Sequence, residues 1–238
     1  TFREKMISTR ASDNCAIVAY CNLVGGQDEL VFDGGSVIFD QRGELIARSK
    51  EFEEDLILAD LDMEAVFRMR LHDPRIRRER SINNEEKSLK KIELPNHRPS
   101  KKKPALPRRN EKPLDNLAEV YGALVLGTRD YVRKNGFHTV LIGLSGGIDS
   151  ALTAAIAVDA LGKKDVVGVA MPSQYSSKSS LEDAKGLAKN LGIRCLTVPI
   201  TEVFQAYLKT LAPPFKGVKP DVTEENIQAR IRGNILMA

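Results

Sequence analysis

The fold of this chain is decided by Thr139-Val-Leu-Ile-Gly-Leu-Ser-Gly-Gly-Ile-Asp-Ser150 and the alanine-rich stretch that follows it. An apolar run of strand formers leads into a glycine-rich turn, and a helical pattern continues from Asp149 to Leu161. A strand, such a turn and a helix in this order form a cradle for phosphate, because the helix N-terminus offers free N–H groups and the positive end of its dipole. The stretch therefore predicts an α/β fold with an anion site at the strand's carboxyl end.

Residue types in the turn fit this chemistry. Gly146 and Gly147 let the backbone approach an anion and adopt φ > 0, and Ser145 and Ser150 offer hydroxyl groups. Asp149 would repel a bare phosphate, so we expect it to hold a Mg²⁺ ion that bridges phosphates. The alternative is a structural turn that only starts a helix and binds no anion. A Walker A lysine is absent, which disfavours γ-phosphoryl transfer by that route.

The six residues from Ser145 to Ser150 resemble the signature of the ATP-pyrophosphatase family. Members of that family cleave ATP between the α and β phosphates and adenylate a substrate oxygen. The resemblance implies ATP and Mg²⁺ as cofactors and Asp149 as the metal ligand. The implied ATP-binding residues are Gly143, Leu144, Ser145, Gly146, Gly147, Ile148, Asp149, Ser150 and Met171.

Strand and helix patterns alternate through the second half of the chain. We expect strands at 139–144, 166–171 and 194–198, and helices at 117–132, 149–161, about 180–191, and from about 201 and 223. This alternation predicts a doubly wound parallel sheet with ligands at the carboxyl ends of its strands. The resemblance assigns the sheet to the adenine-nucleotide α-hydrolase-like (ATP-pyrophosphatase) type.

The first 67 residues have a different pattern. We expect an opening helix, a buried strand over 16–24, a hairpin of 36–39 with 44–47, and another strand over 55–61. So few elements make an incomplete core, so we expect either preceding sequence or a docking partner. The chain starts without Met and stops at Ala238 inside a helical pattern, and we interpret it as a fragment.

A basic, proline-containing stretch separates the two parts. Residues 68–116 hold 16 Lys/Arg against 7 Asp/Glu, whereas the rest of the chain has an acidic excess. With five prolines between Pro74 and Pro107 and no apolar periodicity, the stretch is typical of a solvated linker. An RNA- or phosphate-binding arm is the alternative. We divide the chain into a first domain (1–67), a linker (68–113) and a second domain (114–238).

Two later segments indicate which class of ATP pyrophosphatase the chain resembles. Residues 169–177, Val-Ala-Met-Pro-Ser-Gln-Tyr-Ser-Ser, and 221–232, Asp-Val-Thr-Glu-Glu-Asn-Ile-Gln-Ala-Arg-Ile-Arg, resemble segments of glutamine-dependent NAD synthetases. The backbone near Met171 is expected to recognise adenine. The resemblance gives Asn226 contact with deamido-NAD, and Arg230 is placed beside it. Ser176 and Ser177 could instead only cap a helix, and Arg230 and Arg232 could be solvated helix charges.

The front of the chain, over residues 10–36, resembles the closing third of the nitrilase-type glutaminase domain fused to these synthetases. It implies that 1–67 is the end of a nitrilase-like α-β-β-α domain. No catalytic residue is assigned there, because the family's Cys-Glu-Asp nucleophile motif is absent from this chain. Cys15 and Cys21 are interpreted as packing residues in or beside a strand.

The family resemblance implies ATP-dependent amidation of deamido-NAD to NAD through an acyl-adenylate, with ammonia from glutamine. The expected partners are deamido-NAD, glutamine or ammonia, and a second copy of the chain in a homo-oligomer. Since no apolar run reaches membrane length and no secretory pattern opens the chain, we expect a cytoplasmic protein without membrane or nucleic-acid partners. The alternatives are a tRNA-modifying ATP pyrophosphatase and an inactive fragment with a scaffold role.

Overall fold

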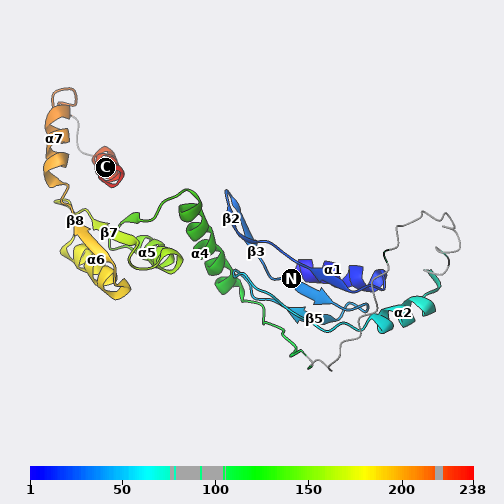
Figure 1. Cartoon of the computed structure of the whole chain (residues 1–238). Helices are drawn as coiled ribbons and strands as arrows, with labels where there is room; N and C mark the ends of the chain where they lie inside the picture. The colour runs from blue at the N-terminus through cyan, green and yellow to red at the C-terminus, as the bar shows by residue number, and fades with distance from the viewer. Residues whose placement is uncertain (76–77, 79–91, 93–103, 105, 218–221) are drawn as a thin grey trace. The chain divides into compact units, whose positions relative to one another are not determined.

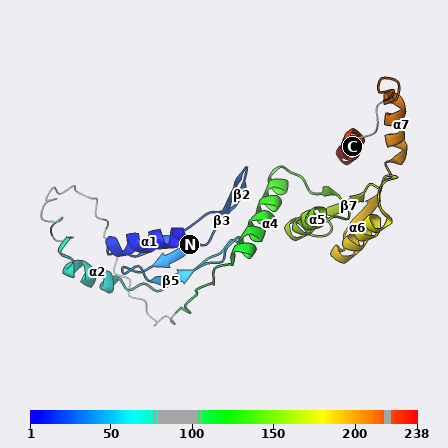
Figure 2. The same cartoon turned by 180° about the vertical axis from the view of Figure 1, so that it is seen from behind.

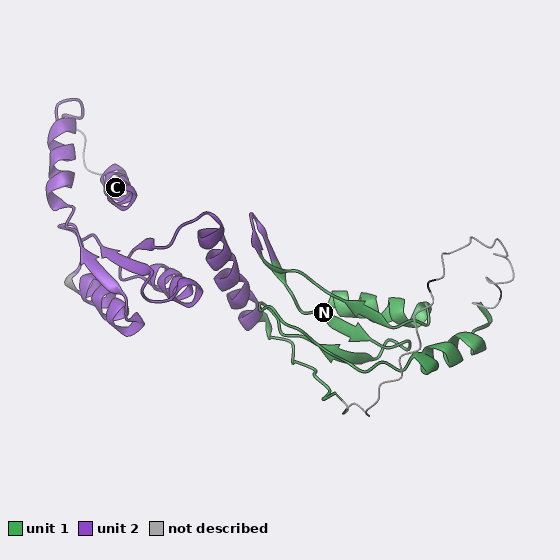
Figure 3. Cartoon of the chain, viewed as in Figure 1, with its two compact units in different colours: residues 1–25, 32–116 green, residues 26–31, 117–238 purple. Residues whose placement is uncertain are grey.

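The chain forms two compact units in the computed structural model, which describes residues 1–75, 78, 92, 104, 106–217 and 222–238. Residues 1–25 and 32–116 make unit 1, and residues 26–31 and 117–238 make unit 2 (Figure 3). More than half of the predicted linker lies outside the described residues. Figures 1 and 2 show the elements of each unit from opposite sides.

Unit 1 is built on an antiparallel sheet in the order β1-β4-β5, which helix α1 covers. Their bounds are α1 Phe2–Asp13, β1 Val18–Tyr20, β4 Val37–Phe39 and β5 Leu45–Arg48. Ile7 and Ala11 of the helix are buried against Val37 and Phe39 of the sheet. Apolar side chains on one face of each element therefore form this core. The predicted opening helix and the predicted hairpin are confirmed.

One strand prediction in unit 1 is confirmed only in part, and another is wrong. Of the predicted strand over 16–24, Val18–Tyr20 forms β1 and pairs with β4; the chain then leaves this sheet, Cys21 and Leu23 are exposed, and Val24 begins a separate strand. Residues 55–61 form no strand, and Leu56 and Leu58 point to solvent. The apolar residues of 55–61 suggested a strand, but no strand in the described part of unit 1 pairs with this segment.

Unit 1 also contains a hairpin and a helix that its sequence pattern does not predict. Strands β2 (Val24–Gln27) and β3 (Leu30–Asp33) pair with each other, although β2 contains two glycines that disfavour strands. Helix α2 (Met63–His72) begins at Asp62, whose side chain accepts a hydrogen bond from the Ala65 N–H at 3.0 Å. Its second half, residues 68–72, falls in the stretch that the charge pattern assigns to the linker.

A half-buried ion pair joins helix α1 to strand β5 of unit 1. Nε of Arg48 donates to Oε1 of Glu4 at 2.7 Å, and Nη2 of Arg48 donates to Oε2 at 3.0 Å. Arg48 also donates to Oδ1 of Asn110 and to the carbonyl of Glu111. The hydrogen bonds from Arg48 hold the pKa of Glu4 below its usual value of 4.5.

We expect Glu4→Gln to lower the free energy of unfolding at pH 7 by about 1 kcal/mol. Because the folded pKa of Glu4 is lowered, its stabilisation is present above pH 4.5 and is lost as the pH falls through the folded value. The variant should therefore lose less stability on acidification. Urea unfolding at pH 7 and pH 3 measures this difference. Glu53→Gln, which removes an exposed pair with Lys50, is the control, and equal behaviour of the two variants would contradict the prediction.

Unit 2 contains a parallel sheet in the order β6-β7-β8 with helices on both faces. The strands are β6 Val140–Gly143, β7 Val166–Ala170 and β8 Arg194–Thr197, and the helices are α4 Asn116–Lys134, α5 Ile148–Leu161, α6 Lys178–Leu191, α7 Thr201–Leu211 and α8 Val222–Met237. These elements confirm the predicted alternation and the α/β fold. No helix in the described part of the chain is long and apolar enough to cross a membrane.

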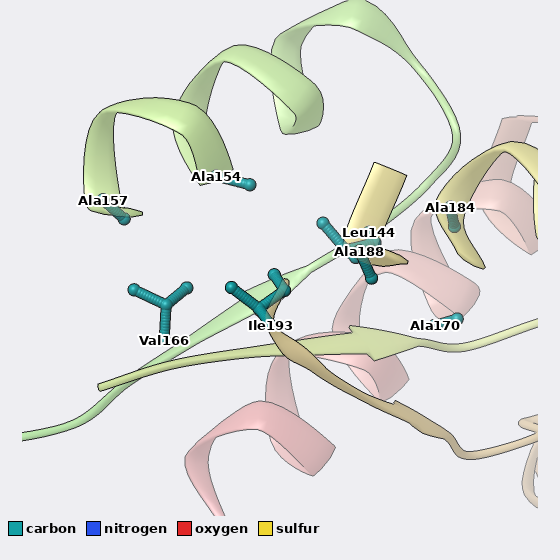
Figure 4. Packing of buried hydrophobic residues seen from close by; sticks show 8 residues of the cluster. All are labelled: Leu144, Ala154, Ala157, Val166, Ala170, Ala184, Ala188 and Ile193. Atoms are coloured by element: carbon teal, nitrogen blue, oxygen red, sulfur yellow. The ribbon is translucent and has the colours of Figure 1, made fainter. Parts of the chain in front are cut away.

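Side chains of β7 alternate between two cores. Val166 and Ala170 face the small residues of α5 and α6, including Ala154 and Ala188, as Figure 4 shows. Val169 and Met171 belong to the opposite core with Ile200, Phe204 and Ile231 from the α7 and α8 side. A parallel strand buried on both faces needs this apolar character at every position. Ile227, Ile231 and Ile235, which recur every four residues along α8, all pack in this second core.

Candidate nucleotide site

The carboxyl ends of the three parallel strands meet at one edge of the sheet. Gly143 pairs with Val169, and Ala170 pairs with Thr197, so the loop after β6 and the segment after β7 start side by side. A cavity of about 530 Å³ opens at this edge. It is lined by Gly143, Leu144, Ser145, Ala170, Met171, Pro172, Ser176, Ser180, Leu181, Ala229, Arg232, Gly233 and Leu236. This is the position at which α/β sheets bind ligands.

The glycine-rich loop has the conformation that its sequence predicts. Gly146 has φ +82°, a value that L side chains rarely adopt, and Gly147 is the N-cap of α5. The Ser145 and Ser150 hydroxyl oxygens lie 3.1 Å apart, and Ser150 Oγ donates to the Gly147 carbonyl at 2.9 Å. These bonds fold the loop over the first turn of α5, where helix N–H groups favour an anion.

The loop packs closely on the start of the next helix. A Cβ on Gly146 would lie 2.5 Å from the Ser180 carbonyl oxygen and 2.8 Å from its Cα. Ser177 is the N-cap of α6 and accepts a hydrogen bond from the Ser180 N–H at 3.1 Å. Helices α5 and α6 therefore both begin beside the same loop, and the capping alternative for Ser177 is what the structure shows. Ser176 accepts from the Ser173 N–H at 2.9 Å and lines the cavity.

Met171 and Arg232 line the cavity beside each other. Met171 follows directly on the end of β7, and its carbonyl oxygen accepts a hydrogen bond from Nε of Arg232 at 3.3 Å. Arg232 is half-buried, and burial lowers the pKa of its guanidinium, which nevertheless remains charged at neutral pH. Because Gly143 has no side chain, the side chain of Met171 can lie close to it: a Cβ at position 143 would lie 3.3 Å from Met171 Cε. The cavity thus combines an apolar floor with one cationic group.

Some predicted site residues line the cavity and others do not. Gly143, Leu144, Ser145 and Met171 line it. Gly146, Gly147, Ile148, Asp149 and Ser150 form the adjoining loop and the first turn of α5. Asn226 and Arg230 are exposed on α8 and do not line this cavity, so their role toward a substrate remains a prediction. Of the same segment, Asp221 lies outside the described residues, and Thr223 lies within α8.

Arg232 is the charged residue among those lining the cavity that were not predicted as binding residues from the sequence. It shares a helix face with Ala229, Gly233 and Leu236, which all line the cavity. The spacing 229, 232, 233, 236 is that of one helical stripe, and it places two small residues beside a cation. This stripe is a signal in the sequence for a ligand-facing surface. The neighbouring row of isoleucines is the more apolar pattern, however, and it indicates only the side of α8 that faces the core.

A magnesium ion fits this site only together with phosphates. Asp149 lies exposed in the first turn of α5, and no group of three His, Cys, Asp or Glu side chains gathers to hold a metal among the described residues. Mg²⁺ is commonly bound by one or two carboxylates plus substrate phosphates. One carboxylate beside an anion-binding loop is consistent with that arrangement.

The fold and the site together define a parallel α/β unit for binding a nucleotide. Comparison with known proteins identifies its family: residues 120–238 match the model of NAD synthase, and the chain belongs to this family. Residues 3–70 match the model of carbon-nitrogen hydrolase. The expectations of an ATP-pyrophosphatase-type sheet and of the end of a nitrilase-like domain are confirmed.

The chain is similar along nearly its whole length to curated relatives. It is 52% identical to the glutamine-dependent NAD(+) synthetase of Thermotoga maritima and 50% identical to that of Aquifex aeolicus, in each case over 99% of this chain. A solved glutamine-dependent NAD+ synthetase from Acinetobacter baumannii, in complex with ADP, matches 99% of the chain with 38% identity and a TM-score of 0.74. The chain spans about 40% of the length of these relatives.

Proposed function

We propose that the protein to which this chain belongs is a glutamine-hydrolysing NAD synthase, which converts deamido-NAD to NAD with ATP and ammonia. A carboxylate oxygen of deamido-NAD bonds to the α-phosphorus of ATP, and the bond to the β-phosphate oxygen breaks. Pyrophosphate leaves, and ammonia then attacks the acyl carbon, loses a proton and displaces AMP. Ammonia comes from glutamine hydrolysed by the nitrilase-like domain.

The observation that carries the proposal is the meeting of the Ser145–Ser150 loop with the cavity at the sheet edge. The N–H groups of the loop and of the first turn of α5 stabilise the negative charge that develops on the departing pyrophosphate. The cavity beside Met171 takes the adenine, whose ring edge can bond to the backbone there, and Arg232 offers guanidinium donors. The family match and the ADP complex of the Acinetobacter relative support this assignment.

Asp149 is the proposed magnesium ligand, and bound Mg²⁺ would neutralise phosphate charge during the departure of pyrophosphate. Asn226 and Arg230 are the proposed contacts for deamido-NAD, because their exposed face of α8 adjoins the face that lines the cavity. The assembly as a homo-oligomer, the cytoplasmic location and the domain division at residues 67 and 113 remain predictions.

The test uses the full-length natural protein with Mg·ATP, deamido-NAD, and either glutamine or ammonium. We expect equal amounts of NAD, AMP and pyrophosphate, formed only when deamido-NAD is present. Product identification by phosphorus NMR and chromatography gives the answer. ADP as the nucleotide product, or AMP formed without deamido-NAD, would overturn the proposal.

A further inference from the structure

The tip of the β2–β3 hairpin belongs to a different unit from its own sequence neighbours. Residues 26–31 lie within the stretch that matches the carbon-nitrogen hydrolase model, yet they cluster with unit 2 (Figure 3). Asp28 turns the hairpin with φ +51°, so the tip is a tight reversal. A short piece of the hydrolase-like sequence is therefore part of the compact unit that carries the NAD synthase match.

Helix α4 holds both backbone polar groups of one tip residue. The N–H of Gly26 donates to Oδ2 of Asp130 at 2.8 Å, and Nζ of Lys134 donates to the Gly26 carbonyl oxygen at 2.6 Å. Lys134 also lies 3.6 Å from Asp130, and Nε of Arg129 donates to Oδ1 of Asp130 at 3.3 Å. Charge-assisted bonds of this kind are stronger than neutral ones and fix the register of the contact.

The charges and the close packing reinforce each other. Burial raises the pKa of Asp130, but the hydrogen bond from Gly26 and the charges of Arg129 and Lys134 outweigh it and lower the pKa overall, which keeps the carboxylate ionised. A Cβ on Gly26 would lie 3.0 Å from the Cα of Gly127, so the backbones meet where both residues lack side chains. An ion pair between exposed side chains on a helix surface would form without a glycine at position 26 or 127.

We propose that residues 26–31 and the Gly127–Lys134 face of α4 form a latch within unit 2, through which the hydrolase-like sequence contributes a hairpin tip to the synthase unit and glutamine hydrolysis is coupled to amidation. The inference rests on the proposed function, because coupling has meaning only if both reactions occur in one protein. The latch residues lie outside the nucleotide cavity and line none of it. Weakening the latch should therefore spare the reaction with free ammonia.

The test compares Asp130→Asn and Lys134→Met with the control Arg133→Met in the full-length natural protein. Arg133 is an exposed cation one position from Lys134 on the same helix. We expect NAD formation with ammonium to stay within about twofold of the unaltered protein, and the yield of NAD per glutamine hydrolysed to fall roughly tenfold in the two latch variants. Circular dichroism and thermal melting verify that the variants are folded.

Equal yields in the latch variants and in Arg133→Met would overturn the proposal, and so would a parallel loss of ammonium-driven activity. If the unaltered protein makes no NAD from ammonium, the proposed function fails instead. In that case, amide hydrogen exchange still tests whether the latch contact forms. The Gly26 N–H should exchange about tenfold faster in Asp130→Asn than in Arg133→Met, and an unchanged rate would refute it.

Discussion

Replacing Gly146 with alanine is expected to reduce ATP affinity and NAD formation by the full-length protein about 100-fold or more. The residue has φ +82°, which costs about 1 kcal/mol or more for a residue with a side chain. The new methyl group would also lie 2.5 Å from the Ser180 carbonyl oxygen, a distance that backbone atoms do not tolerate. Either the loop or the start of α6 must move, and the phosphate-facing N–H groups lose their alignment.

Gly186→Ala is the matched control. Gly186 lies exposed in α6, and a Cβ there would meet nothing within 4 Å, so the change should leave activity unaltered and slightly stabilise the helix. Isothermal titration of each variant with Mg·ATP measures affinity, and the product assay measures rate. A Gly146→Ala protein that binds ATP within twofold of the unaltered protein would show that the loop does not hold the phosphates.

Replacing Arg232 with methionine is expected to lower kcat/KM for ATP roughly 10- to 100-fold. Arg232 is the cation of the cavity wall, and a hydrogen bond to a charged group typically contributes about 1.5–3 kcal/mol. Methionine retains a flexible apolar stem against Met171 and Leu236, so the loss would report on the guanidinium and not on packing. The Met171 carbonyl oxygen would also lose a donor.

Arg230→Met, two residues away on the same helix, separates the two proposed nucleotide contacts. Arg230 is exposed and does not line the cavity, so we expect unchanged ATP binding and a higher KM for deamido-NAD. Steady-state kinetics with each substrate varied in turn distinguishes the cases. If Arg232→Met leaves the ATP parameters unaltered while Arg230→Met impairs them, the assignment of the cavity to ATP is wrong.

Long periodic segments were predictable from the sequence. The elements from β6 to α8 follow their apolar patterns because each contributes to one of the two cores that cover the faces of the sheet. The phosphate loop was equally clear, since glycine and serine types at fixed spacing carry both the turn and the chemistry. Gly146, with its positive φ and its contact on α6, shows that local sequence and tertiary packing agree there.

Features that depend on distant partners were not predictable. Leu56 and Leu58 have strand-like spacing but find no partner strand among the described residues of unit 1, whereas β2 forms in spite of Gly25 and Gly26. The hydrogen bond between Gly26 and Asp130 of α4 joins residues about a hundred positions apart, and no local sequence pattern encodes it. For Arg232 the sequence shows the helical stripe but not its place in the cavity, because that place follows from the rotation of α8 against the sheet.

Transfer of isotopic oxygen tests the acyl-adenylate most directly. Deamido-NAD labelled with ¹⁸O in its carboxylate is incubated with the full-length protein, Mg·ATP and ammonium, and the products are analysed by mass spectrometry. If the carboxylate attacks the α-phosphorus, each AMP formed carries one labelled oxygen and the pyrophosphate carries none. Unlabelled AMP, or label in inorganic phosphate released with ADP, would contradict the account.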